Sequence, residues 1–333
     1  MKILFVANYK EGVGGISGQV AALQQHLREE GHTADIFSTM GTAVARLVLP
    51  LRIKSILRNY DIIHIHCCSN WGFLPAVIGV LSAKKMKKRA VLTYHGGGAQ
   101  NFFKRHKRLV KYVLLRTDKN IVLSGFLGKV FDKYLIPYTI IPNIIDFDCS
   151  LYRKRPLLHP NFICIRSHEK IYNIPCILRA FKILQEKVPD AKLTLVGDGS
   201  LHAYLKQLVS EMRLNNVAFT GRVDNSFIYD YLNQADIMVS SPTVDNMPVS
   251  LLEAMNAGLL VISSNVGGVP YIVRDSENGL LFKTDDEVAL AQKMLWALDN
   301  QKDALTIVDA AHKDVMNYNW MSIRTKLLSA YSE

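Results

Sequence analysis

The sequence SPTVDNMPVSLLEAMNAG, at residues 241–258, reads as a polar loop that leads into a short helix from Ser250 to Ala257. Ser250 followed three residues later by Glu253 is a capping-box pattern, and Pro248 lies just upstream, so the helix is expected to start sharply. Its first backbone N–H groups then face the loop and favour phosphate. Carboxylates at Asp245 and Glu253 stand eight residues apart, and carboxylates accept hydrogen bonds from hydroxyls. The stretch therefore predicts a site for a ligand with phosphates and hydroxyls, such as a nucleotide sugar; the alternative is that Glu253 only completes the cap.

The run that follows, EAMNAGLLVISSNVGGVPYIVRDSENGLLF, adds a strand-like segment and a pair of glycines. From Asp245 to Phe282 the sequence resembles the donor-binding segment of the family 4 retaining glycosyltransferases (glycosyl transferases group 1). In that family two glutamates eight residues apart are followed by an EAM-type helix, a strand and a GGxxE sequence. Two positions differ here: Asp245 replaces the first glutamate, and Tyr271 stands where a glutamate usually follows GGVP. The shorter aspartate withdraws its carboxylate by roughly 1.5 Å, about one C–C bond.

Length and composition predict a globular protein. The chain has 333 residues, 49% hydrophobic and 21% charged, which is enough to bury two ordinary cores. The N-terminal apolar run is five residues long, which indicates a first strand rather than a signal peptide, and no window reaches the roughly 18 apolar residues of a membrane span. The five scattered cysteines form no CxxC pair and are typical of reduced thiols. We expect a cytoplasmic protein that is soluble or peripherally bound to the inner face of the membrane.

The positive charge is confined to the first half of the chain. Residues 1–150 contain 21 Lys and Arg against 9 Asp and Glu, whereas residues 151–333 contain 19 against 20. The excess is concentrated in Lys84–Arg89 and in Phe102–Tyr112, where aromatic residues alternate with cations. Such segments favour an anionic membrane surface. A nucleic-acid surface and a solvated helix face are the alternatives, and we expect no nucleic-acid partner.

The N-terminus follows a phosphate-binding order of strand (2–7), glycine loop and helix (19–30). The GxGGxxG spacing begins five residues past the strand, which disfavours a nicotinamide dinucleotide site. The same region resembles the glycosyltransferase family's N-terminal GG loop. The resemblance implies that the backbone at Gly14 and Gly15 lies against the donor diphosphate.

The remaining chain alternates strand-like and helical segments, which predicts parallel sheets covered by helices on both faces. Strand-like runs occur at 61–65, 90–94, 120–123, 139–141, 162–165, 193–196, 217–219 and 236–240. This pattern resembles the family's GT-B architecture: an α/β fold of two facing Rossmann-like domains with an interdomain cleft. The resemblance implies an acceptor-binding domain at 1–145, a donor-binding domain at 146–315, and a C-terminal helix at 316–333 that packs back on the first domain.

Histidines mark the ends of two predicted strands in the first half. His64 and His66 alternate on one face of DIIHIHC, and with Cys67 and Cys68 they suggest zinc, but no second ligand pair follows at a usual spacing. We therefore expect no metal. His95, in TYHGGG, ends a strand where open α/β sheets bind ligands. It matches the family's HG turn, which implies contact with the reacting sugar.

The sequence IIPNIIDFD, residues 140–148, resembles the family's IPNGVD domain junction. Its Asp146-x-Asp148 also has the form of the metal-binding DxD motif of a different glycosyltransferase fold. We disfavour a metal site here because the surrounding sequence does not match that motif's context. Beyond the junction, Arg166 matches the arginine that neutralises the donor diphosphate. The family's lysine is expected near Tyr172 or Asn173, and Lys170 comes earlier than that.

The resemblance implies metal-independent sugar transfer, with retention, from a nucleotide diphosphate sugar to a growing glycan, with no bound cofactor and UDP-sugars favoured over GDP-sugars. A lipid-linked acceptor in capsule or lipopolysaccharide synthesis fits the basic first half. The implied catalytic residues are His95, Arg166, Asp245 and Glu253, and the implied donor-binding residues are Gly14, Gly15, Arg166, Lys170, Asn246, Met247, Pro248, Val249, Ser250 and Glu253. The alternative is a catalytically degenerate GT-B protein that binds sugar nucleotide or membrane without turnover. A same-fold epimerase or phosphorylase fits less well, because the EAM and IPN segments point to transferases.

Overall fold

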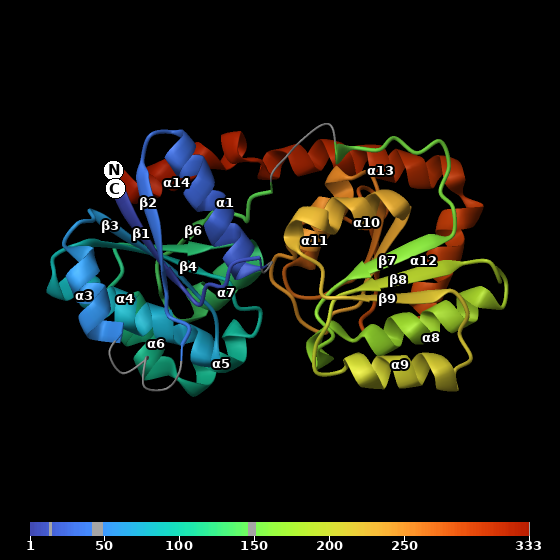
Figure 1. Cartoon of the computed structure of the whole chain (residues 1–333), viewed down its shortest axis with the longest axis horizontal. Helices are drawn as coiled ribbons and strands as arrows, with labels where there is room; N and C mark the ends of the chain where they lie inside the picture. The colour runs from blue at the N-terminus through green and yellow to red at the C-terminus, as the bar shows by residue number, and fades with distance from the viewer. Residues whose placement is uncertain (13–14, 42–48, 146–150, 333) are drawn as a thin grey trace. The chain divides into compact units, whose positions relative to one another are not determined.

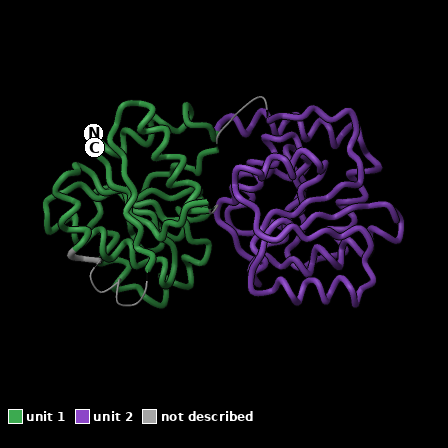
Figure 2. Tube along the Cα trace, viewed as in Figure 1, with its two compact units in different colours: residues 1–146, 318–333 green, residues 147–317 purple. Residues whose placement is uncertain are grey.

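Short apolar runs form two six-stranded parallel sheets, one in each of two compact units (Figures 1 and 2). The computed structural model describes residues 1–12, 15–41, 49–145 and 151–332. Unit 1 comprises Met1–Asp146 and Tyr318–Glu333, and unit 2 comprises Phe147–Asn317. The strand order is β2-β1-β3-β4-β5-β6 in unit 1 and β12-β11-β10-β7-β8-β9 in unit 2. The predicted α/β class with parallel sheets is therefore confirmed.

Unit 1 places strands and helices in alternation. Its elements are β1 (Lys2–Ala7), α1 (Ile16–Glu29), β2 (Thr33–Ser38), α3 (Leu49–Leu57), β3 (Ile62–Cys67), the 3₁₀ helix η1 (Asn70–Phe73), α4 (Leu74–Lys85), β4 (Arg89–Tyr94), α5 (Ala99–Arg105), α6 (Lys107–Leu114), β5 (Lys119–Val122), α7 (Gly125–Lys133), β6 (Thr139–Ile140) and α14 (Trp320–Ser332). Most predicted strands agree with these bounds to within a residue or two, because β1, β3, β4 and β5 are almost continuous buried runs.

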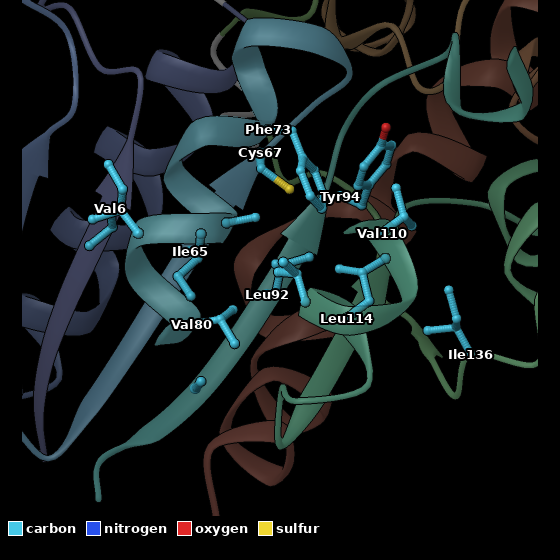
Figure 3. Packing of buried hydrophobic residues seen from close by; sticks show 14 of the residues in the cluster. Val6, Ile65, Cys67, Phe73, Val80, Leu92, Tyr94, Val110, Leu114 and Ile136 are labelled. Carbon is cyan, nitrogen blue, oxygen red and sulfur yellow. The ribbon is translucent and has the colours of Figure 1, made fainter. Parts of the chain in front are cut away.

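Both faces of the unit 1 sheet are covered, as the uninterrupted apolar strands require. In β1 the side chains alternate: Leu4 and Val6 join a core with α4, α6 and α7, shown in Figure 3, whereas Ile3 and Phe5 face α1 and α14. The C-terminal helix α14 is held there by a hydrogen bond from Trp320 Nε1 to Glu30 Oε1, 2.8 Å long. The last residues of the chain thus complete the core of the first unit.

Unit 2 repeats the plan. Its elements are β7 (Asn161–Ile165), the 3₁₀ helix η3 (Lys170–Tyr172), α8 (Ile174–Gln185), β8 (Lys192–Val196), α9 (His202–Glu211), β9 (Val217–Gly221), the 3₁₀ helix η4 (Asn225–Phe227), α10 (Ile228–Gln234), β10 (Ile237–Ser240), α11 (Val249–Asn256), β11 (Leu260–Ser264), the 3₁₀ helix η5 (Val269–Tyr271), β12 (Leu280–Phe282), α12 (Glu287–Asp299) and α13 (Gln301–Val315), followed by the 3₁₀ helix η6 (Met316–Tyr318) at the boundary. Helices α8 and α12 pack together over one face of this sheet.

Candidate active site

An arginine and an aspartate meet at the carboxyl edge of the unit 2 sheet. Arg166 directly follows β7, and its neighbour in the sheet, β10, ends at Ser240. Arg166 Nε donates to Ser240 Oγ at 3.3 Å, and Arg166 Nη2 lies 3.1 Å from Asp245 Oδ2. The two charged side chains are only 9% and 17% exposed. Two of the predicted site residues are thus brought into direct contact.

This ion pair leaves hydrogen-bonding capacity unused. Arg166 Nη2 and Asp245 Oδ2 are both buried, and neither atom has a partner with hydrogen-bond geometry in the described part of the chain. Buried polar atoms without partners are rare in folded proteins and call for an explanation such as a ligand. A phosphate oxygen would suit the guanidinium, and a sugar hydroxyl would suit the carboxylate.

Tyr172 covers the guanidinium from the adjoining 3₁₀ helix. The Arg166 guanidinium carbon lies 5.2 Å from the centre of the Tyr172 ring, which is a cation–π distance. Burial raises the pKa of the Tyr172 phenol, so the ring stays neutral beside the cation. Lys170, at the start of η3, is exposed. The two positions near which the family lysine is expected are therefore occupied by Tyr172 and Asn173.

Backbone contacts fix the loop that carries Asp245. Ser241 Oγ donates to the carbonyl of Asn173 at 2.8 Å, and the Gly268 N–H donates to the carbonyl of Asp245 at 3.0 Å. Gly267 has φ +55°, and a side-chain carbon built on it would lie 1.9 Å from that same carbonyl oxygen. Only glycine fits there, which gives the GG pair of the sequence a physical role.

Glycine is also required beside Arg166. Gly197 follows β8 with φ +141°, and a side-chain carbon there would lie 2.0 Å from the Arg166 carbonyl oxygen. Sequence reasoning did not single out this glycine, although the GDG at the end of a predicted strand was a usable signal.

The helix after the loop begins one residue earlier than predicted, and the capping box is wrong. Pro248 is the N-cap of α11, Val249 is its first residue, and no side chain caps it. Ser250 therefore lies inside the first turn, where its Oγ is buried without a hydrogen-bond partner in the described chain. The proline places the helix start, because it is held in an extended conformation with φ −70°.

The other predicted donor residues lie along the same loop and helix. Asn246 and Met247 are buried, and the Asn246 N–H donates to Asp245 Oδ1 at 2.8 Å. Glu253 is half-buried within α11. Tyr271, the second departure from the family pattern, ends the 3₁₀ helix η5 and is 46% exposed.

In unit 1, Gly15 is the N-cap of α1 with φ 68°, and Gly14 lies outside the described residues, as do Asp146 and Asp148. His95 follows β4, and its N–H donates to the carbonyl of Cys67 at 2.8 Å. The predicted shared face of His64 and His66 is confirmed, with ring centres 4.4 Å apart. Within the described ranges, no three His, Cys, Asp or Glu side chains are grouped as a metal site requires.

His95 forms a contact that sequence reasoning missed. Its Nε2 lies 2.8 Å from Nδ1 of His66 on the neighbouring strand, and the rings stack with centres 5.1 Å apart. Burial lowers the pKa of His95 to about 3 and that of His66 well below its usual value. Both imidazoles are therefore neutral at physiological pH.

Two protein-family models together match most of the chain. The model for Glycosyltransferase Family 4 matches residues 13–148, and the model for Glycosyl transferases group 1 matches residues 157–314. The N-acetyl-alpha-D-glucosaminyl L-malate synthase of Bacillus anthracis is 26% identical over 266 residues, which cover 73% of this chain and 67% of that protein. A GalNAc-alpha-(1->4)-GalNAc-alpha-(1->3)-diNAcBac-PP-undecaprenol alpha-1,4-N-acetyl-D-galactosaminyltransferase of Campylobacter jejuni is 28% identical over 224 residues, 66% of this chain and 59% of its own.

A solved structure shows the same fold. The crystal structure of Anabaena Alr3699/HepE in complex with UDP-glucose superposes with a TM-score of 0.81 at 17% sequence identity, covering 100% of this chain and 99% of that one. The family models, the relatives and this fold agree with one another. The chain belongs to the family 4 (group 1) glycosyltransferases, which are retaining, metal-independent GT-B enzymes that use nucleotide sugars.

Proposed function

We propose that this enzyme transfers a sugar from a UDP-sugar to a hydroxyl of a growing, lipid-linked glycan in bacterial surface polysaccharide synthesis. The observation that carries the donor assignment is the unsatisfied pair in unit 2, where Arg166 Nη2 and Asp245 Oδ2 lie buried and 3.1 Å apart. A nucleotide diphosphate sugar offers phosphate oxygens to the first atom and hydroxyls to the second. One ligand can thereby form hydrogen bonds with both side-chain atoms.

The leaving group is a nucleoside diphosphate, so catalysis depends on stabilising the negative charge that develops on it. In this proposal Arg166 supplies the main positive charge, and the N-terminus of α11 adds oriented N–H groups. The family resemblance assigns Gly14 and Gly15 to the same diphosphate. Lys170 is a further candidate cation, four residues after Arg166. No protein nucleophile is assigned.

The sugar and the nucleoside are assigned to the remaining predicted residues. Asp245, with Asn246, Met247, Pro248 and Val249, holds the sugar hydroxyls, and Glu253 binds the ribose. Ser250 Oγ, buried without a partner in the described chain, is one more group that a donor can satisfy. His95 contributes a neutral imidazole to the transferred sugar.

Similar proteins support the proposed nucleotide and the proposed acceptor. HepE was crystallised with UDP-glucose, which supports uridine in the donor. The Campylobacter jejuni relative acts, by its name, on a glycan linked to undecaprenol through diphosphate, which supports a lipid-linked acceptor. We propose that unit 1 binds such an acceptor while the enzyme is peripherally attached, from the cytoplasm, to the membrane.

Donor binding gives the first prediction. Among UDP-, GDP- and ADP-sugars, UDP-sugars are expected to raise the melting temperature, because a ligand at 100 times its dissociation constant stabilises the folded state by about 2.7 kcal/mol. Arg166→Ala and Glu253→Ala should abolish the shift. Glu186→Ala and Lys187→Ala, exposed beyond the end of α8, serve as matched controls and should retain it.

The results of this binding experiment distinguish a different nucleotide, a binder without activity and the absence of a donor site. A shift confined to GDP- or ADP-sugars would correct the nucleotide. Binding without sugar release or transfer on any acceptor would favour the degenerate binder, for which Asp245, Tyr271 and the early position of Lys170 are the supporting features. No shift with any nucleotide sugar would contradict the donor site.

The basic runs of unit 1 lie on or near two helices, α4 and α6, and support the proposed membrane attachment. Helices α4 and α6 pack together, and Lys84 near the end of α4 forms a 2.6 Å ion pair with Asp118, just beyond α6. The cations at 104, 105, 107 and 108 are exposed, as is Tyr112 beside Arg116. Phe102 and Phe103 are buried in the core, so the predicted aromatic character of this surface is wrong for them. No helix in the described ranges is long and apolar enough to cross a bilayer.

Vesicle binding tests this surface. Lys104, Arg105, Lys107 and Arg108 changed together to Gln should weaken binding to phosphatidylglycerol vesicles by on the order of 100- to 1,000-fold, since each cation near an anionic surface contributes about 1 kcal/mol. The control changes four exposed unit 2 lysines, Lys187, Lys192, Lys302 and Lys313, to Gln and should bind as the parent does. Equal loss in both variants, or no binding by the parent, would contradict a dedicated membrane face.

A further inference from the structure

His66 and His95 form a buried pair in which one ring nitrogen of His66 is hydrogen-bonded and the other is not. His66 lies in β3 opposite Thr93 of β4, and its ring reaches past that residue to the turn that carries His95. The His66 Nδ1 to His95 Nε2 distance of 2.8 Å is that of a hydrogen bond. On the other side of the ring, His66 Nε2 is buried and has no hydrogen-bond partner in the described chain.

The shared hydrogen bond couples the proton positions of the two rings. Each neutral imidazole carries one N–H, and the bond between them needs one proton. A proton on Nδ1 of His66 donates to Nε2 of His95, which must then carry its own proton on Nδ1. The opposite arrangement places a proton on Nε2 of His66, where it is buried without an acceptor.

At the His66 end of the pair, the first arrangement is favoured energetically. An orphaned buried N–H costs about 1–3 kcal/mol and is rarer in proteins than an orphaned acceptor. The adjoining pocket, about 20 Å³, has room for about one water, and besides the two paired rings its polar lining residues are Gln19, His64, Thr93 and Asn143. Gln19 already bonds the backbone of Ile144 through both amide atoms, and His64 bonds Tyr331 and Thr93. A water there would find few remaining partners, so the pocket does not rescue the second arrangement.

We propose that His66 is a positioning residue that holds His95 as the tautomer protonated on Nδ1. His95 is then a hydrogen-bond donor through Nδ1 and not a base at that atom, which suits stabilisation of a sugar oxygen. His66 itself need not touch the sugar. This inference about catalysis rests on the proposed role of His95, whereas the tautomer can be measured in the enzyme without substrate.

The test combines nitrogen NMR with kinetics. Histidine-labelled protein, with the His95 signals assigned by comparison with His95→Gln, should show His95 protonated on Nδ1. His66→Asn keeps an amide donor near the position of Nδ1 and should preserve this tautomer, whereas His66→Leu should abolish the preference. Turnover should fall about 10- to 100-fold in His66→Leu, by analogy with metal-bound histidines that lose the partner orienting them, with recovery in His66→Asn.

Tyr331→Phe is the matched buried control. The Tyr331 hydroxyl lies 2.7 Å from Nδ1 of His64, a different histidine of the same strand as His66. Loss of this hydroxyl should therefore leave the His95 tautomer and the turnover unchanged. A wild-type His95 protonated on Nε2, or a tautomer unchanged in His66→Leu, would overturn the proposal, and the first result needs no variant to fold. A tautomer that shifts as expected while His95→Gln retains full activity would instead overturn the role of His95.

Discussion

Arg166→Ala is expected to lower the rate of sugar transfer by about 10²- to 10³-fold, the effect of removing one donor to a developing oxyanion. The guanidinium is held by Ser240, Asp245 and Tyr172, so it needs little reorganisation at the moment of reaction. Steady-state kinetics with the donor class identified by thermal shift measures the effect. Both kcat and donor affinity should fall, because the phosphate is bound before it becomes the leaving group.

The variant Arg166→Lys distinguishes the contribution of the positive charge from that of the planar guanidinium group. Lysine keeps the charge but loses the planar fork and the stacking on Tyr172, so its activity should lie between those of the parent and Arg166→Ala. Arg274→Ala, which removes exposed ion pairs to Glu277 and Asp314, is the control and should transfer normally. An Arg166→Ala enzyme within about threefold of the parent would show that the leaving group is stabilised elsewhere.

Arg155→Met is expected to destabilise unit 2 by about 3–5 kcal/mol, the cost of breaking a buried ion pair by removing one partner. The Arg155 side chain is fully buried and pairs with Asp236 at 2.8 Å. It also donates to the carbonyls of Ala257 and Gly258 beyond α11, and to carbonyls at the end of α10. Its guanidinium therefore stabilises the negative ends of two helices that meet the sheet.

Hydrogen exchange can localise this effect. Peptides of unit 2 should lose protection in Arg155→Met, while peptides of unit 1 should not, because the two units have separate cores. Arg153→Met, two residues away and exposed, should cost less than about 1 kcal/mol. Unchanged protection in unit 2, or an equal loss in both units, would contradict the role given to Arg155.

The sequence predicted the fold well, because the strands of parallel sheets are continuous apolar runs with short polar boundaries. It also predicted which loop carries Asp245, since the spacing from Asp245 to Gly268 is contained in one local segment. The capping box failed for a local reason: Pro248 starts α11 one residue early and moves Ser250 into the first turn.

Contacts between distant segments could not be predicted. Arg166 and Asp245 are 79 positions apart, and the loop that carries Asp245 is tied to the chain at Asn173, next to the Tyr172 ring that covers the guanidinium. Arg155 has no local pattern, because its acceptors are backbone carbonyls that any residue supplies. The His66–His95 bond depends on the pairing of β3 with β4, although two histidines at neighbouring strand ends were an available signal.

Release of nucleoside diphosphate from a UDP-sugar, followed in the presence of EDTA with NMR of the sugar product, tests the central claim most directly. We expect release without added metal and a sugar that keeps the anomeric configuration it had in the donor. No release from any nucleotide sugar under conditions where a donor binds, or a product with inverted configuration, would contradict it.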